Sequence, residues 1–372
     1  MNPVARSLPA LIALFAATPL TAQEISVPQS RPIPGSGPAL LVYSPGQVRC
    51  ADGEVTSVEL LTPYPNAQGV RFENLPEVEL SFRIDADGRA RGIEKKGERF
   101  TWPLNDDAEP ALAGSRFTSG QAHTGCTIRY GAKSVPFAEA PIAQLAAFWA
   151  VPHPDRSQDR AVMKALQPVG ANCYDTALHP RVVHYADYKL PGRPGAPDFA
   201  VVTFDVDKTG KSVAVRTLTS TGNAAFDKNV MAAAAATSFE AGSPRTGCVA
   251  RYGRSTRAPL TTPAPDKNAF KPAETCKEEP AWLSKPPLRF PANFNRRSIQ
   301  GWAMLRFDVA PWGAVGNVRV LASEPADEFG VAARPIVEMA KKPSSERGYS
   351  GCIQLVSFKI ADQPGEAGDI AD

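Results

Sequence analysis

The sequence predicts an α+β protein made of three tandem small modules. Each module is expected to be a three-stranded antiparallel sheet in the order strand, strand, helix, strand, with one covering helix and one disulfide. Three observations predict this class: six evenly spaced cysteines, a glycine that recurs midway between them, and alternating apolar residues followed by a helical pattern. We place the modules at residues 40–132, 165–254 and 270–361, and name them the first, second and third units.

The cysteines fall into three pairs of nearly constant separation. The pairs Cys50–Cys126, Cys173–Cys248 and Cys276–Cys352 are 76, 75 and 76 residues apart. This spacing favours one pairing among the fifteen that six cysteines allow. Free buried thiols, a metal site and a redox-active pair are the alternatives; the sequence has no C-x-x-C motif, and its four histidines are scattered. Closing a loop of this length stabilises a small core by about 4 kcal/mol in the chain-entropy model.

Two strands and a tight turn are predicted in the middle of each unit. The segments SFRIDADG, TFDVDKTG and RFDVAPWG end at Gly88, Gly210 and Gly313. Alternation of apolar and polar residues before each glycine indicates a half-buried strand, and the glycine suits a turn that needs a positive φ. A second strand follows, most clearly at 213–218 and 315–321.

A helix and a last strand complete each unit. Helical spacing of apolar residues predicts the helix; Pro110 should bend or shorten the one in the first unit. The residues concerned are Leu104, Ala108, Ala111 and Leu112; Phe226, Val230, Ala233 and Ala234; and Phe329, Ala333, Ile336 and Val337. The last strand carries the second cysteine, and GCIQLVSFKI in the third unit is expected to be longer than GCTIRYG and GCVARYG.

The remaining segments are predicted to be connectors and a leader. Residues 133–172 should be a linker with one short helix, and 254–275 a linker rich in Pro, Thr and Ala. The tail after 361 is acidic and expected to be disordered.

The N-terminus predicts a secretory signal at residues 1–22. Arg6 precedes the thirteen-residue apolar stretch from Leu8 to Leu20, which is shorter than the roughly 20 residues that span a bilayer. We therefore expect cleavage near Ala22 and a soluble exported protein. An uncleaved inner-membrane anchor is the alternative.

The third unit resembles the TonB C-terminal domain family. The matching features are Phe290-Pro291 at the end of a proline-rich lead-in, Gly301, the strand LRFDV, the turn at Gly313, the strand VRVLASEP and an alanine-rich helix. The second unit is similar through FAVVTFDVDKTGKSVAVRTLTSTG, and the first more weakly through Tyr64-Pro65.

This resemblance implies a periplasmic domain that passes energy from an inner-membrane complex to outer-membrane transporters in transmembrane transport. It implies protein binding by strand addition, in which a short transporter segment extends an exposed sheet edge. The edge expected here is the last strand of the third unit. Its partner-binding residues would be Gly351, Ile353, Gln354, Leu355, Val356, Ser357 and Phe358.

The sequence departs from the transducers of that family. It lacks a convincing membrane anchor and a long proline-rich arm, and it has three units with predicted disulfides. A soluble protein cannot transmit force from an inner-membrane motor. The alternative is a non-transducing scaffold or binding protein of the cell envelope, with peptidoglycan or a partner subunit as its ligand.

No catalytic motif is found in the sequence, and we expect no enzyme activity, cofactor or small-molecule substrate. The segment from Asp205 to Gly210 resembles a calcium loop, but Arg216 stands where the bidentate Glu belongs. His123, His153, His179 and His184 lack metal-ligand spacing. A formal charge of +3 indicates no nucleic-acid partner.

Overall fold

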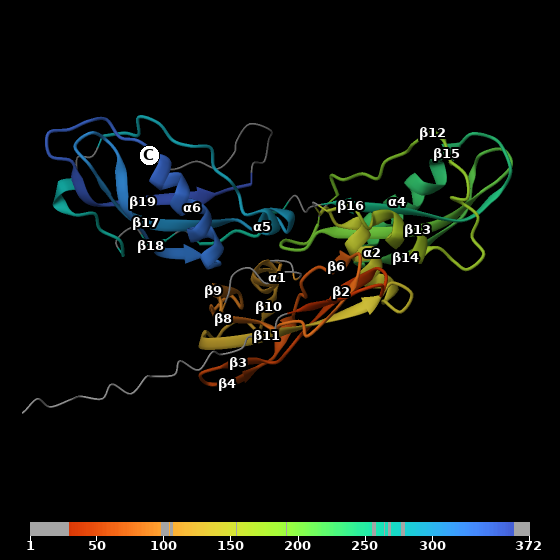
Figure 1. The fold of residues 1–372 in the computed structure, drawn as a ribbon, viewed down its shortest axis with the longest axis horizontal. Helices are drawn as coiled ribbons and strands as arrows, with labels where there is room; N and C mark the ends of the chain where they lie inside the picture. Colours follow the sequence, from red (N-terminus) through yellow and green to blue (C-terminus); the bar gives the residue numbers. More distant parts are fainter. Residues whose placement is uncertain are drawn as a thin grey trace, which may run out of the picture.

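Antiparallel sheets dominate the structure, and a few helices pack on and between them (Figure 1). The computed structural model describes residues 30–97, 104, 107–153, 155–190, 192–254, 258–263, 265–266, 269–276 and 280–360. The predicted signal at 1–22 and the acidic tail from 361 therefore lie outside the described residues.

The first unit contains a seven-stranded sheet. Its strands are β2 (Ala39–Pro45), β3 (Val48–Cys50), β4 (Gly53–Val55), β6 (Asn66–Gln68), β8 (Val78–Ile84), β9 (Ala90–Lys95) and β11 (His123–Pro136). The first half of β11 pairs with β8 and the second half with β2. Two short strand pairs flank this sheet: β1 (Arg31–Ile33) with β7 (Arg71–Glu73), and β5 (Ser57–Glu59) with β10 (Arg116–Phe117).

The prediction of a three-stranded sheet is therefore wrong for the first unit. Leu40, Leu41 and Tyr43 are buried and form β2, which adds to the part of β11 beyond β8. The expected boundary at residue 132 falls inside β11. The helix α1 (Ala108–Gly114) begins after Leu104 and has only seven residues. Pro110 lies in its first turn, where a missing N–H costs no helical hydrogen bond.

The second and third units have three-stranded sheets with the predicted order of elements. The second contains β13 (Asp198–Val206), β14 (Ser212–Ser220), α4 (Ala224–Ala236) and β16 (Arg245–Arg254), and the short pair β12 (Pro180–Val182) and β15 (Ser238–Phe239). The third contains η1 (Glu274–Cys276), α5 (Ala292–Arg296), β17 (Gly301–Val309), β18 (Val315–Glu324), α6 (Asp327–Met339) and β19 (Tyr349–Phe358). The strand orders are β14-β13-β16 and β18-β17-β19.

The three predicted turn glycines occupy one geometry. Gly88, Gly210 and Gly313 have φ of +72°, +83° and +88°. A Cβ on each would lie 2.3, 2.1 and 2.0 Å from the carbonyl oxygen of Phe117, Phe239 and Lys342 respectively. Both the backbone angle and the close approach therefore require glycine.

All three predicted disulfides are present. Cys50 bonds Cys126, Cys173 bonds Cys248, and Cys276 bonds Cys352. Each one ties the lead-in segment of its unit to the last strand, as the spacing predicted.

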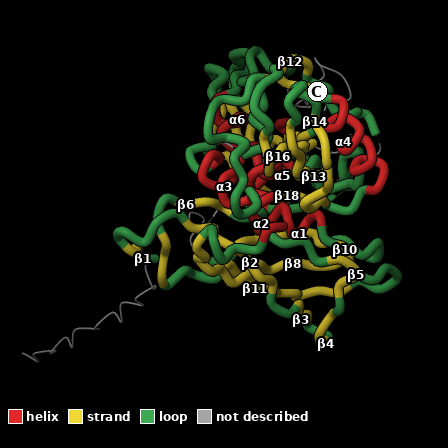
Figure 2. The backbone as a smooth tube through the Cα atoms, turned by 90° about the vertical axis from the view of Figure 1, so that its right-hand side faces the viewer, coloured by secondary structure: helices red, strands yellow, loops and turns green. Residues whose placement is uncertain are grey.

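The segment 133–172 is a structural element rather than the linker that we expected. Besides the end of β11 it forms two helices, α2 (Ile142–Ala150) and α3 (Asp159–Leu166). Their buried side chains share one apolar cluster with Leu40 of the first unit and Val201 of the second. In Figure 2, α1 and α2 lie between the sheet of the first unit and the rest of the protein.

The first and third units share an apolar core and a buried ion pair. Leu112 and Ile93 belong to the same cluster as Leu305 and Phe329. Beside it, Arg297 donates to both carboxylate oxygens of Asp107, and the two side chains are 2% and 0% exposed. Burial alone would raise the pKa of Asp107, but the guanidinium groups of Arg297 and Arg296 hold it below its usual range. The charge pair therefore fixes the third unit against the first.

Candidate functional site

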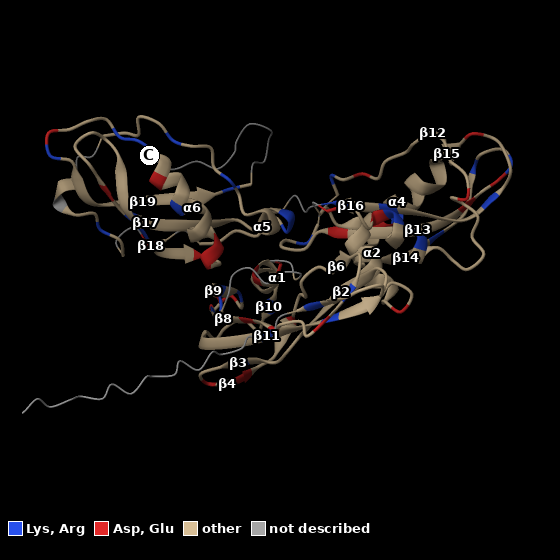
Figure 3. Cartoon of the chain, in the orientation of Figure 1, with Lys and Arg blue, Asp and Glu red and all other residues tan. Residues whose placement is uncertain are grey.

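The edge strands of the sheets are the candidate binding sites of this fold, because an edge strand presents backbone N–H and C=O groups that a further strand can bond. Positive and negative side chains are interspersed over all three units (Figure 3). Among the described residues, no group of three or more His, Cys, Asp or Glu side chains could hold a metal ion. No helix in that part of the chain is long and apolar enough to cross a membrane. Asp207 lies in the segment that resembles a calcium loop. Its carboxylate instead accepts hydrogen bonds from the backbone N–H groups of Thr209 and Lys211 in the hairpin turn.

The strand β19 forms one edge of the third sheet, with β17 as its neighbour. The two strands pair without interruption from Phe307↔Cys352 to Gly301↔Phe358, which is seven consecutive residues. A regular strand presents evenly spaced backbone donors and acceptors on its outer side. This geometry makes β19 a template for a further strand.

The predicted site residues divide between the two faces of the sheet. Gln354, Val356 and Phe358 are buried on the side of α6, where Phe358 packs against Phe290 and Phe329 at centroid distances of 5.8 and 5.2 Å. Ile353, Leu355 and Ser357 alternate with them and are half-buried on the opposite face. A partner strand added beside β19 would therefore contact side chains of β19 on both faces of the sheet.

Gly351, another predicted site residue, is already engaged inside the unit. It has a φ of +67°, donates its N–H to Asp308 Oδ1 at 2.7 Å, and accepts the N–H of Ala273 at 3.1 Å. The uninterrupted part of the edge therefore begins after the disulfide, at Ile353.

Side-chain contacts of Gln354 show which way the backbone of β19 faces. The Gln354 Oε1 atom accepts the indole N–H of Trp282 at 2.9 Å, and its Nε2 atom donates to the carbonyl of Leu355 at 2.9 Å. The Leu355 carbonyl therefore faces away from β17, on the outer side of the β17–β19 ladder. Alternation in an antiparallel ladder gives Ile353 and Ser357 the same outward direction.

The corresponding edge of the first unit is closed by the chain itself. By their distance from the second cysteine, Thr127 and Arg129 correspond to Ile353 and Leu355. Thr127 pairs with Arg49 of β3, and the Arg129 carbonyl accepts the N–H of Gly46 at 2.7 Å. A strand of the same chain occupies the position that a partner would take.

The corresponding edge of the second unit is closed by side chains and a helix. The Tyr174 hydroxyl donates to the Val249 carbonyl at 2.7 Å, and the Gln167 amide donates to the Gly247 carbonyl at 3.4 Å. At the other end, Gly253 lies against the carbonyl of Ala150 in α2, so closely that a Cβ would be 2.1 Å from that oxygen. These covering residues were missed by sequence reasoning, because they come from segments outside the unit's recurring pattern.

Accessibility, and not length, distinguishes β19. The expectation that it is the longest last strand is wrong, because β19 and β16 each have ten residues and β11 has fourteen. A strand extends as far as its partners do, and the partners of β11 and β16 reach beyond the recurring sequence. Among the described residues, no other strand pairs with the outer edge of β19 from 353 to 358, and the side chain that bonds its Leu355 carbonyl is that of Gln354 in the same strand.

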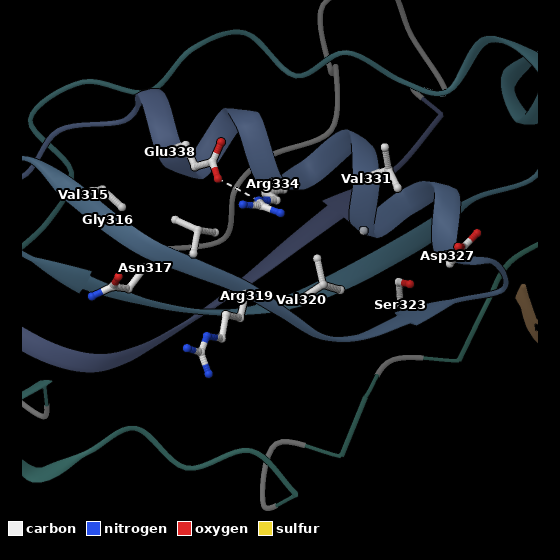
Figure 4. Close-up of a pocket in the computed structure, with 12 residues that line it drawn as sticks. Val315, Gly316, Asn317, Arg319, Val320, Ser323, Asp327, Val331, Arg334 and Glu338 are labelled. Atoms are coloured by element: carbon white, nitrogen blue, oxygen red, sulfur yellow. Dashed lines mark hydrogen bonds and ion pairs between the residues drawn. The ribbon is translucent and has the colours of Figure 1, made fainter. Parts of the chain in front are cut away.

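The opposite edge of the same sheet has a different character. The register of β18 shifts twice against β17, and Asn317 has a φ of +51°. Such bulges prevent regular addition of a strand. Between β18 and α6 lies a hollow of about 990 Å³, lined by residues that include Asn317, Val320, Val331 and Arg334 (Figure 4).

Comparison with known proteins shows a similarity that covers the third sheet. Residues 286–358 match the family described as the Gram-negative bacterial TonB protein C-terminal. The chain is 31% identical over 100 residues to Protein TonB of Klebsiella pneumoniae, covering 27% of this chain and 41% of that protein. It is 29% identical over 103 residues to Protein TonB of Escherichia coli strain K12, covering 28% and 43%. The chain thus spans less than half the length of these relatives. The resemblance predicted for the third unit is confirmed: residues 286–358, which end with β19, match the TonB C-terminal domain family.

Proposed function

We propose that the third unit binds an extended segment of a partner protein along the outer edge of β19, from Ile353 to Phe358. The observation that carries the proposal is what bonds the outer edge of each of the three last strands. β11 is paired and β16 is capped, whereas β19 has an unbroken register and an unpaired outer side within the described residues.

The first unit supplies an internal example of this binding mode. There, β3 and β2 lie along β11 and bond its outward backbone groups. A partner strand on β19 would use the N–H and C=O groups of Ile353, Leu355 and Ser357 in the same way. The Gln354 amide, which now donates to the Leu355 carbonyl, would give way to a backbone N–H of the partner.

The partner we propose is an outer-membrane transporter, and the process is TonB-type transport across the envelope. The relatives named Protein TonB support this reading. We further propose that residues 1–22 direct export to the periplasm and are removed, and that the protein has no enzymatic role. The energy-transducing step itself would require attachment to an inner-membrane complex.

We also propose that the three units are copies of one module, the first of them enlarged by β2 to β4. The matching turn glycines and the matching disulfides support this. In this reading the first two copies support the third.

A non-transducing envelope scaffold is the second candidate. The buried contact between Asp107 and Arg297 favours it, because it holds the third unit rigidly on the first. Capture of an outer-membrane transporter by the third unit would support the transport function over the scaffold function.

The direct test is Leu355→Pro, which removes one outward backbone donor, with Leu355→Ala as the matched control that keeps it. We expect the proline variant to lose the transporter and the alanine variant to bind only about two- to fivefold more weakly, because strand addition depends on backbone groups. Ser357→Pro provides a second test if Leu355→Pro does not fold. A folded proline variant that still captures the transporter would rule out strand addition at this edge.

A further inference from the structure

A β-bulge recurs at one position in the strand that follows the turn glycine of every unit, which is β9, β14 or β18. Four residues after the turn glycine, Gly92, Ala214 and Asn317 have φ of +56°, +52° and +51°. In each sheet the pairing skips the phenylalanine opposite the bulge, which is Phe82, Phe204 or Phe307. The same local geometry is therefore built three times.

In the first unit this bulge binds an extended segment from the third unit. Gly92 N–H donates to Glu324 Oε2 at 2.8 Å, and Ile93 N–H donates to the Pro325 carbonyl at 2.9 Å. Arg83 completes the contact with Glu324 Oε1 at 2.6 Å. Ile93 and Ala326 then form a parallel bridge, so the sequence Glu-Pro-Ala runs alongside β9.

This internal contact defines the ligand chemistry of the bulge. Two successive N–H groups point away from the sheet, one toward a carboxylate and the next toward the carbonyl of the following proline. Successive N–H groups that face one direction favour anionic partners. The contact is buried, because Ile93 and Ala326 are fully covered and Glu324 is only 8% exposed.

In the third unit the equivalent bulge opens into the hollow between β18 and α6. Figure 4 shows Arg334 and Glu338 extending from α6 toward β18, with Val320 and Val331 lining the space between. Gly330 has no side chain there, and a Cβ would lie 2.7 Å from Val320 Cγ1. The hollow is thus apolar where the chain after the proline would lie, since Val320 and Val331 are 39% and 47% exposed.

The charges at this bulge differ from those in the first unit. Asp308 replaces Arg83, but its carboxylate is held by the Asn317 amide and by the N–H of Gly351, each at 2.7 Å. Arg319, which replaces Glu94 two residues after the bulge, is exposed on β18. Arg334 is paired with Glu338 at 2.7 Å, so Arg319 supplies the positive charge near the bulge.

We propose that this hollow is a second docking site, which binds an extended partner segment containing a Glu or Asp followed by proline. The N–H groups of Asn317 and Val318 donate to the carboxylate and to the proline carbonyl, as Gly92 and Ile93 do in the first unit. Arg319 balances the carboxylate charge, and Val320 and Val331 contact the residues that follow. The site lies at the opposite edge of the sheet from β19, so it is independent of strand addition there.

A synthetic peptide with the sequence VLASEPADE, which copies residues 320–328, is the probe. We would add it to the full-length ¹⁵N-labelled protein and follow the backbone amide resonances. Saturable shifts at Asn317 and Val318 are expected. Replacing the first Glu of the peptide by Gln should weaken binding about tenfold, since a charge-assisted hydrogen bond is lost.

Variants of the protein sharpen the test. Arg319→Glu should weaken binding about tenfold or more, whereas Arg216→Glu, at the same position of the second unit, should leave it unchanged. Leu355→Pro should also leave it unchanged, which separates this site from β19. The proposal is overturned if the shifts fall at Gly92 and Ile93 or along 353–358 instead. It is equally overturned if the Gln peptide or the Arg319→Glu variant binds as well as its parent.

Discussion

Gly313 shows how a single residue sets the hairpin on which the binding sheet depends. Its φ of +88° and its contact with the Lys342 carbonyl leave no room for a Cβ. The turn joins β17 to β18 and also anchors the chain that follows α6, because Lys342 N–H donates to the Gly313 carbonyl. Two parts of the unit therefore meet at one glycine.

Replacing Gly313 by Ala should lower the free energy of unfolding of the third unit by at least about 2 kcal/mol. The loss combines the left-handed backbone cost with the close contact to Lys342. Gly316→Ala is the matched control, since nothing lies within 4 Å of its added Cβ. Urea unfolding followed by tryptophan fluorescence would measure both; equal midpoints for the two variants would contradict this account.

Residues that belong to a recurring sequence pattern could be assigned a role from the sequence. Residues whose role is a contact with a distant part of the chain could not. The turn glycines and the cysteines recur at fixed spacing, so their roles were visible. Tyr174 and Gln167 close the edge of β16 from 75 and 80 residues away, and no local pattern marks them. The open edge of β19 could be proposed from the sequence, but the closure of the other two required the structure.

At the scale of elements, the last strands differ in what covers their outer edges. β11 is paired on both edges, with β8 and with β3 and β2, whereas β19 is paired with β17 alone. The strand pattern predicted which segments become strands. It could not predict how far β11 extends, because β2 comes from a stretch that the other units do not have.

Removal of the third disulfide by Cys276→Ser and Cys352→Ser should destabilise this unit by about 4 kcal/mol in the chain-entropy model. It should also loosen the start of β19, where Ala273 N–H bonds the Gly351 carbonyl. Hydrogen exchange measured by mass spectrometry would report faster exchange at residues 349–354.

The matched control is the pair Cys50→Ser and Cys126→Ser in the first unit. There, the pairing of β3 with β11 remains and should keep exchange near residue 127 slow. Equal loss of protection in β11 and β19 would show that the disulfide, and not pairing on both sides, holds these strands.

At the scale of the whole molecule, the three units are joined by buried contacts rather than by free linkers. Arg297 and Asp107 are 190 residues apart in sequence and meet in the shared core of the first and third units. Helices α2 and α3 join the first unit to the second. Sequence periodicity shows where each unit has an apolar face, but not which faces of different units meet.

The contact between the first and third units should respond to pH through Glu109. Burial first, then a hydrogen bond with Asp327 and the charges of Glu328 and Asp327, raise the pKa of this carboxyl from its ordinary value of 4.5 to about 9, against the opposing charge of Lys95. The folded state therefore favours protonated Glu109. Its stabilising contribution is complete below pH 4.5 and is lost as the pH rises toward 9.

We expect wild-type stability to fall from pH 5 to pH 9, with a slope that approaches about 1.4 kcal/mol per pH unit where unfolding releases the Glu109 proton. Glu109→Gln, which imitates the protonated carboxyl, should flatten this profile and unfold at a higher temperature at pH 8. Thermal unfolding across the pH range measures both. A Glu109→Gln profile as steep as that of wild type would assign the pH dependence to another group.

The central claim is that β19 is the edge at which the protein captures its partner, and site-specific photocrosslinking in cells tests it most directly. A photoreactive residue at Ser357 should crosslink an extended segment of an outer-membrane transporter, which mass spectrometry would identify and map. The same group at Thr217, an exposed residue on the bulged edge strand β14, should not capture it. Leu355→Pro should abolish the Ser357 product. Capture of the transporter from Thr217 as efficiently as from Ser357, or an undiminished product in the proline variant, would contradict the account.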